Sequence, residues 1–98
     1  MVPAECSLDE DELREQLGRY RRVGESSTVR ARESRRLVIA VGHEVPDALV
    51  DRLVEVERTC CPFFELVWHP RVRELSISVD QAAHERRLAG LAAALAAA

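Results

Sequence analysis

The spacing of hydrophobic residues changes several times along the chain, and each change marks a predicted element. Segments 8–24, 46–60 and 80–98 carry an apolar residue every three or four positions, as on one face of a helix. Segments 27–41 and 64–79 alternate apolar and polar residues around a short turn, which is typical of a β-hairpin. The predicted order is therefore α-β-β-α-β-β-α.

This order predicts an α+β fold in which a four-stranded antiparallel sheet has its helices packed mainly on one face. Such an arrangement buries the apolar side of every predicted element. The length of 98 residues fits a single domain over 1–98. The second face of the sheet would remain uncovered, and its apolar residues favour a homodimer. We assign to that face Val38, Ala40, Phe63 and Val67.

Local signals predict where the helices begin and end. Ser7 and Glu10 have the spacing of a capping box, so the first helix is expected to begin at Leu8. Gly24 is expected to end it in a left-handed conformation. Asp80 is expected to cap the last helix. The predicted inward face of the first helix consists of Leu13, Leu17 and Tyr20.

Composition narrows the classes of partner. The net charge is −3, and all 14 basic residues are arginine. Nucleic-acid binders carry a basic face, so the acidic balance argues against a nucleic-acid partner. No apolar run approaches the roughly 20 residues of a membrane helix, and the first residues do not resemble a secretory signal. We expect a cytoplasmic protein with reduced cysteines.

The most unusual feature is the pair Cys60-Cys61, because the whole chain has only three cysteines. Adjacent residues of a helix point about 100° apart, so the two thiols can have different surroundings. Together they could bind a soft ion such as Cu(I), Hg(II), Zn(II) or trivalent arsenic, whose charge displaces the thiol protons. Cys6 becomes a third ligand if the start of the first helix lies beside the end of the second.

Other side chains are candidates for supporting roles at such a site. His84 lies on the apolar stripe of the last predicted helix and could supply a neutral imidazole to a metal. Glu57 stands one helical turn before Cys61 and could accept a thiol proton or pair with Arg58 or Arg52. Phe63 could screen the thiols from water. A packed histidine and a surface ion pair are the simpler readings of His84 and Glu57.

The stretch ERTCCPFF, together with CSL near the amino end and LSISV in a late strand, resembles a group of small, poorly characterised bacterial proteins. Their pattern is C-x-L followed much later by E-R-x-C-C-P-F, and some are associated with heavy-metal resistance genes. The resemblance implies that the positions of interest are Cys6, Glu57, Arg58, Cys60, Cys61, Pro62 and Phe63.

Two alternatives to a metal-binding protein remain open from the sequence. The first is a thiol enzyme in which Cys61 is the nucleophile and Glu57 moves the proton. A cysteine at a helix carboxyl end is disfavoured for this role, because the helix dipole there raises the thiol pKa. The second is an interaction domain in which the cysteines only pack and the function lies in a dimer face.

Overall fold

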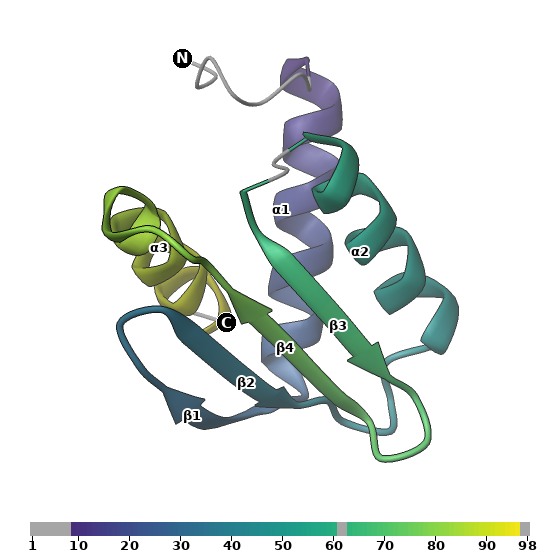
Figure 1. Cartoon of the computed structure of the whole chain (residues 1–98). Coiled ribbons are helices and arrows are strands. Elements are labelled where there is room, and N and C mark those ends of the chain that lie inside the picture. Colours follow the sequence, from purple (N-terminus) through teal and green to yellow (C-terminus); the bar gives the residue numbers. More distant parts are fainter. Residues whose placement is uncertain (1–8, 61–62, 97–98) are drawn as a thin grey trace.

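The computed structural model describes residues 9–60 and 63–96, with the side chain of Ala96 left out. The chain folds in the expected order, with one short 3-10 turn, η1, before the last helix (Figure 1). The elements are α1 (Glu10–Glu25), β1 (Thr28–Arg32), β2 (Arg36–Ala40), α2 (Asp47–Cys60), β3 (Glu65–His69), β4 (Glu74–Ser78), η1 (Ala82–His84) and α3 (Glu85–Ala96).

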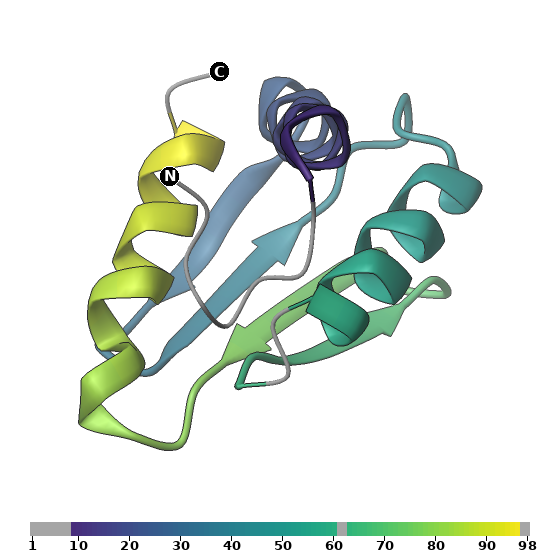
Figure 2. The ribbon, with the colours of Figure 1, turned by 90° about the horizontal axis from the view of Figure 1, so that it is seen from above.

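The four strands form one antiparallel sheet in the order β1-β2-β4-β3. Both hairpins are therefore adjacent in the sheet, and β2 and β4 form its centre. The helices lie together on one face, with α1 across the middle and α2 and α3 on either side (Figure 2). The predicted fold class is confirmed, including the face of the sheet that no described helix covers.

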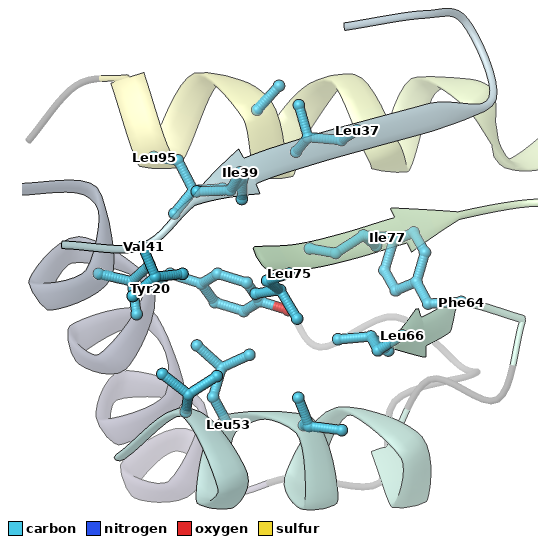
Figure 3. Packing of buried hydrophobic residues seen from close by; sticks show 14 of the residues in the cluster. Tyr20, Leu37, Ile39, Val41, Leu53, Phe64, Leu66, Leu75, Ile77 and Leu95 are labelled. Atoms are coloured by element: carbon cyan, nitrogen blue, oxygen red, sulfur yellow. The ribbon is translucent and has the colours of Figure 1, made fainter. Parts of the chain in front are cut away.

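The core lies between the sheet and the helices (Figure 3). Leu37 and Ile39 of β2 are each 1% exposed, and Leu75 and Ile77 of β4 are each 0% exposed. These alternate positions point to the helical side, as the period of two in the sequence predicted. The ring of Tyr20 reaches into the same layer from α1.

Helix α1 differs from the prediction in its start and its inward face. It begins at Glu10, and its N-cap is Asp9, whose Oδ1 accepts a 2.8 Å hydrogen bond from the backbone N–H of Glu12. The predicted start at Leu8 is therefore wrong, while Ser7 lies outside the described residues. Leu17 is 47% exposed, contrary to its predicted inward position. The buried side chains are Gln16, Tyr20 and Val23.

Gly24 does not end α1. The helix continues to Glu25, and its C-cap Ser26 has a φ of −121°, so no left-handed residue is needed. A Cβ at Gly24 would lie 2.3 Å from the backbone oxygen of Leu95 in α3. The glycine therefore serves close packing between α1 and α3.

The start of α3 also differs from the prediction. The N-cap of η1 is Gln81, which makes no side-chain capping bond, and α3 begins only at Glu85. Asp80 precedes this cap, so its predicted capping role is wrong. The buried face of α3 includes Leu88, Ala92 and Leu95. No helix of the described residues is long and apolar enough to cross a membrane.

Candidate functional site

The two helices that flank the cysteine pair run in opposite directions. The amino end of α1 and the carboxyl end of α2 consequently lie at the same end of the molecule (Figure 1). Gln16 ties them together, because its Nε2 donates to the backbone oxygen of Leu53 at 2.9 Å. Cys60 is the last residue of α2. Cys6, Cys61 and Pro62 lie outside the described residues.

Cys60 points into the protein and is only 2% exposed. It is disulfide-bonded, which differs from the expected reduced state. The sequence contains two other cysteines, Cys6 and Cys61. The expectation of reduced cysteines therefore fails for Cys60.

Glu57, one turn before Cys60, is a buried carboxylate with 5% exposure. Its Oε1 accepts hydrogen bonds from the hydroxyl of Tyr20 at 2.5 Å and from Nε2 of Gln16 at 3.2 Å. The simpler reading of Glu57 as a surface ion pair is wrong. Arg52 pairs instead with the exposed Glu55 at 3.5 Å.

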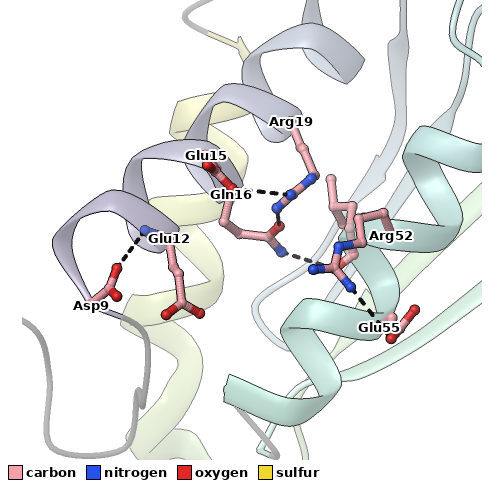
Figure 4. A network of polar contacts seen from close by, with 8 residues as sticks. Asp9, Glu12, Glu15, Gln16, Arg19, Arg52 and Glu55 are labelled. Atoms are coloured by element: carbon pink, nitrogen blue, oxygen red, sulfur yellow. Dashed lines mark hydrogen bonds and ion pairs between the residues drawn. The ribbon is translucent and has the colours of Figure 1, made fainter.

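A chain of polar contacts connects α2 with the surface of α1 through Gln16 (Figure 4). Nη1 of Arg19 donates to Oε1 of Gln16 at 2.8 Å, and Nη2 of Arg19 lies 3.8 Å from Glu15. Sequence reasoning did not identify Gln16 or Tyr20 as part of the site. The available signal was their spacing of four residues, which places both on one helix face.

Arg58 faces away from the Glu57 carboxylate. Its Nη2 donates to the backbone oxygen of Leu66 at 2.8 Å, which fastens the end of α2 to β3. The interpretation that Arg58 pairs with Glu57 is therefore wrong. Arg58 holds the cysteine-bearing end of the helix in place from the sheet side.

Phe63 belongs to an aromatic group just before β3 and not to the uncovered sheet face, so its assignment to that face is wrong. It precedes β3 and packs against the core. Its ring centroid lies 4.7 Å from that of Phe64 and 4.5 Å from that of His84, on which it stacks. The guanidinium of Arg87 lies over the same ring at 5.3 Å.

His84 ends η1 and lines a cavity of about 360 Å³. Its Nδ1 is buried and has no hydrogen-bond partner among the described residues. A buried nitrogen without a partner is uncommon, because an unmade hydrogen bond costs free energy. His84 thus has a free ring nitrogen beside Phe63. The other residues around the cavity are Phe63, Glu65, Ser78, Val79, Asp80 and Gln81.

The carboxyl end of α2 and the amino end of α1 bring opposite ends of two helix dipoles together, and Glu10, Asp11 and Glu12 add negative charge to the first turn of α1. The last carbonyls of α2 carry the negative end of the helix dipole. At the start of α1, the hydrogen bond from the backbone of Glu12 lowers the pKa of Asp9. Hydrogen bonding to the Asp9 side chain raises the pKa of Glu12. Within residues 9–60 and 63–96, no three metal-ligating side chains form a group.

The described part of this region therefore has a buried sulfur and a buried carboxylate on α2, Cys60 and Glu57, and an aromatic group of Phe63, Phe64 and His84 outside the helix. Two of the three proposed sulfur ligands, Cys6 and Cys61, belong to the part of the chain that is not described. No protein-family model, curated protein or solved structure matches the chain, so the function is argued from these residues alone.

Proposed function

We propose that the protein binds a soft metal or metalloid ion of the Hg, Cu, Zn or As class through Cys60 and Cys61, with Cys6 as the third thiolate. The observation that carries this proposal is the disulfide at Cys60. Because a disulfide requires two sulfur atoms in contact, its reduction leaves two thiols close together at the end of α2. A soft ion can bridge two such thiols.

The surroundings of Cys60 favour an ion over a free thiolate. Burial and the negative end of the α2 dipole both disfavour a charged sulfur. A bound cation supplies the missing positive charge and displaces the thiol proton, so metal binding does not require an activated cysteine. This argument supports a non-enzymatic binding protein.

Nearby residues have defined roles in this proposal. Glu57, fixed by Tyr20 and Gln16, adds a negative charge one turn from Cys60 and is available to receive a displaced proton. Phe63 shields the sulfurs from water. His84, stacked on Phe63 and with its Nδ1 free, is the candidate nitrogen ligand. Reduced thiols require a reducing compartment, as expected of a cytoplasmic protein.

Titration of the fully reduced protein with Hg(II), Cu(I) or arsenite tests the proposal. We expect sulfur-to-metal charge-transfer absorption that saturates at a fixed stoichiometry, and thiols that no longer react with an alkylating reagent. Cys60→Ser should abolish the absorption. Thr59→Ala is the matched control, because Thr59 is exposed on the same turn, and it should bind as the wild type does. Unchanged spectra with freely reacting thiols would exclude the proposal.

A thiol enzyme is the second candidate, because the disulfide at Cys60 is also compatible with thiol–disulfide exchange. This alternative needs a stabilised thiolate at Cys61, with a thiol pKa well below the ordinary value of about 8.5. Alkylation rates of Cys61 measured against pH in a Cys6→Ser, Cys60→Ser protein distinguish the two. An ordinary or raised pKa favours the binding protein.

A further inference from the structure

The face of the sheet opposite the helices has an uncharged centre. Inward residues of the strands, such as Leu37 and Ile77, define the helical side, so their sequence neighbours point outward. One outward row crosses all four strands through the paired residues Ala31, Val38, Ser76 and Val67. Val38 is 6% exposed and the other three are half-buried. This row carries no charge.

Unpaired charges of opposite sign lie at one end of this face. Arg36 on β2 and Glu65 on β3 are exposed, and both pair in register with Ser78 on β4. Neither side chain has a hydrogen-bond or ion-pair partner within residues 9–60 and 63–96. Since adjacent strands are about 4.8 Å apart, the two residues lie about 10 Å apart on either side of β4. They are therefore too distant for a direct ion pair within one molecule.

The register makes this face complementary to itself. A two-fold axis running along β4 exchanges the positions of β2 and β3, because each neighbours β4. Stacking a second copy about this axis would place Arg36 over the partner's Glu65, and Glu65 over the partner's Arg36. The same rotation would place Val38 over the partner's Val67, since both pair with Ser76.

The remaining outward charge on β4 is compatible with this arrangement. Glu74 would lie near the axis and face its own copy, which would be unfavourable for a free carboxylate. Its Oε2 is 3.5 Å from Nη1 of Arg30, so its charge is already compensated within each molecule. The small side chains of Ser76 and Ser78 on the same strand allow two sheets to approach.

We propose that this face is the contact between two copies of the chain, related by a two-fold axis along β4. The contact pairs Arg36 with Glu65 twice and packs Val38 on Val67 twice. The axis overlays the three strands β2, β4 and β3 on those of the copy and leaves β1 outside the overlap. The contact is therefore three strands of five residues, about 17 by 14 Å, which is small for a stable dimer. The dimer is therefore weak, reversible and sensitive to salt.

Sedimentation velocity of the reduced wild-type protein from about 10 µM to about 1 mM tests the assembly. We expect a concentration-dependent shift from monomer to dimer that weakens as salt is raised. Arg36→Glu places like charges opposite one another, as does Glu65→Arg, and each should weaken the dimer about tenfold or more. Arg71→Glu reverses an exposed charge in the β3–β4 turn and should not change the association.

Mixing the two singly changed proteins gives the sharpest result. In a homodimer of Arg36→Glu two acidic side chains face each other in each facing pair, and in a homodimer of Glu65→Arg two basic side chains do. In a dimer of one Arg36→Glu chain and one Glu65→Arg chain, both facing pairs have opposite charges, because the first chain is acidic at both positions and the second is basic at both. We expect the mixture to form a heterodimer, and the double variant R36E/E65R to form a homodimer again. Circular dichroism checks that each variant is folded.

Two results would overturn the proposal. A wild-type protein that stays monomeric over the whole concentration range has no such contact. A dimer that neither reversal weakens, or that mixing does not restore, uses another surface. The sedimentation runs use metal-free protein, so neither result depends on the metal titration. Glu65 lines the His84 cavity and Arg36 does not, so Arg36→Glu leaves the lining of that cavity unchanged.

Discussion

Replacing Gly42 by alanine should lower the free energy of unfolding by about 3 kcal/mol or more. Gly42 follows β2, and a Cβ built on it would lie 1.8 Å from the backbone oxygen of Ser26, the C-cap of α1. The obstacle is backbone, so it cannot rotate away as a side chain would. Relief requires moving the α1–β1 junction away from the end of β2.

The chain provides a matched control for this substitution. A Cβ at Gly18, within α1, would meet nothing within 4 Å. Gly18→Ala should therefore stabilise the protein by about 0.5–1 kcal/mol, because alanine favours the helix more than glycine does. Urea unfolding of both variants, in the reduced state, measures the difference. A Gly42→Ala protein as stable as the wild type would contradict the close approach.

Removing the Glu57 carboxylate should have the second large effect. Glu57→Ala is expected to destabilise the reduced protein by about 2–4 kcal/mol, because it opens a cavity and removes the acceptor of two buried donors. Those donors are the hydroxyl of Tyr20 and Nε2 of Gln16. Tyr20→Phe removes the hydrogen bond to Glu57 and keeps the ring, and it should cost about 1–3 kcal/mol.

Two comparisons separate this network from a general effect of changing α2. Glu55→Ala, on the exposed side of α2, should change stability by no more than about 0.5 kcal/mol. Glu57→Gln keeps an oxygen that can accept from Tyr20, so it should cost less than Glu57→Ala. If chemical denaturation shows that Glu57→Ala and Glu55→Ala lower the free energy of unfolding equally little, the Glu57 carboxylate does not link α1 to α2.

The fold was predictable because most of its information is local. The inward alternation of Leu37, Ile39 and Val41 identified β2, and all three are buried as expected. Short turns restricted the strand neighbours, so the antiparallel hairpins followed from the sequence. The failures lay where tertiary contacts override the local pattern. Gly24 resembled a helix stop, but the approach of α3 explains its lack of a side chain.

The candidate site was only partly predictable for the same reason. The sequence identified Glu57 but not its partners, because a buried carboxylate is satisfied by residues 37 and 41 positions away. On hydrophobicity alone Leu17 is a better inward residue than Gln16. The amide of Gln16 is nevertheless buried, since it bonds Leu53 across the helix interface. Long-range polar pairing leaves no periodic signal in a single sequence.

The central claim is that cysteine sulfurs converge at the shared end of α1 and α2 and together bind one soft ion. X-ray absorption of the reduced protein loaded with one equivalent of Hg(II) tests it most directly, because the fine structure counts the sulfur neighbours of the metal. We predict two or three sulfur atoms around each ion in the wild type, and fewer in Cys60→Ser. An ion surrounded only by oxygen and nitrogen, or an unchanged sulfur count in Cys60→Ser, would contradict the claim.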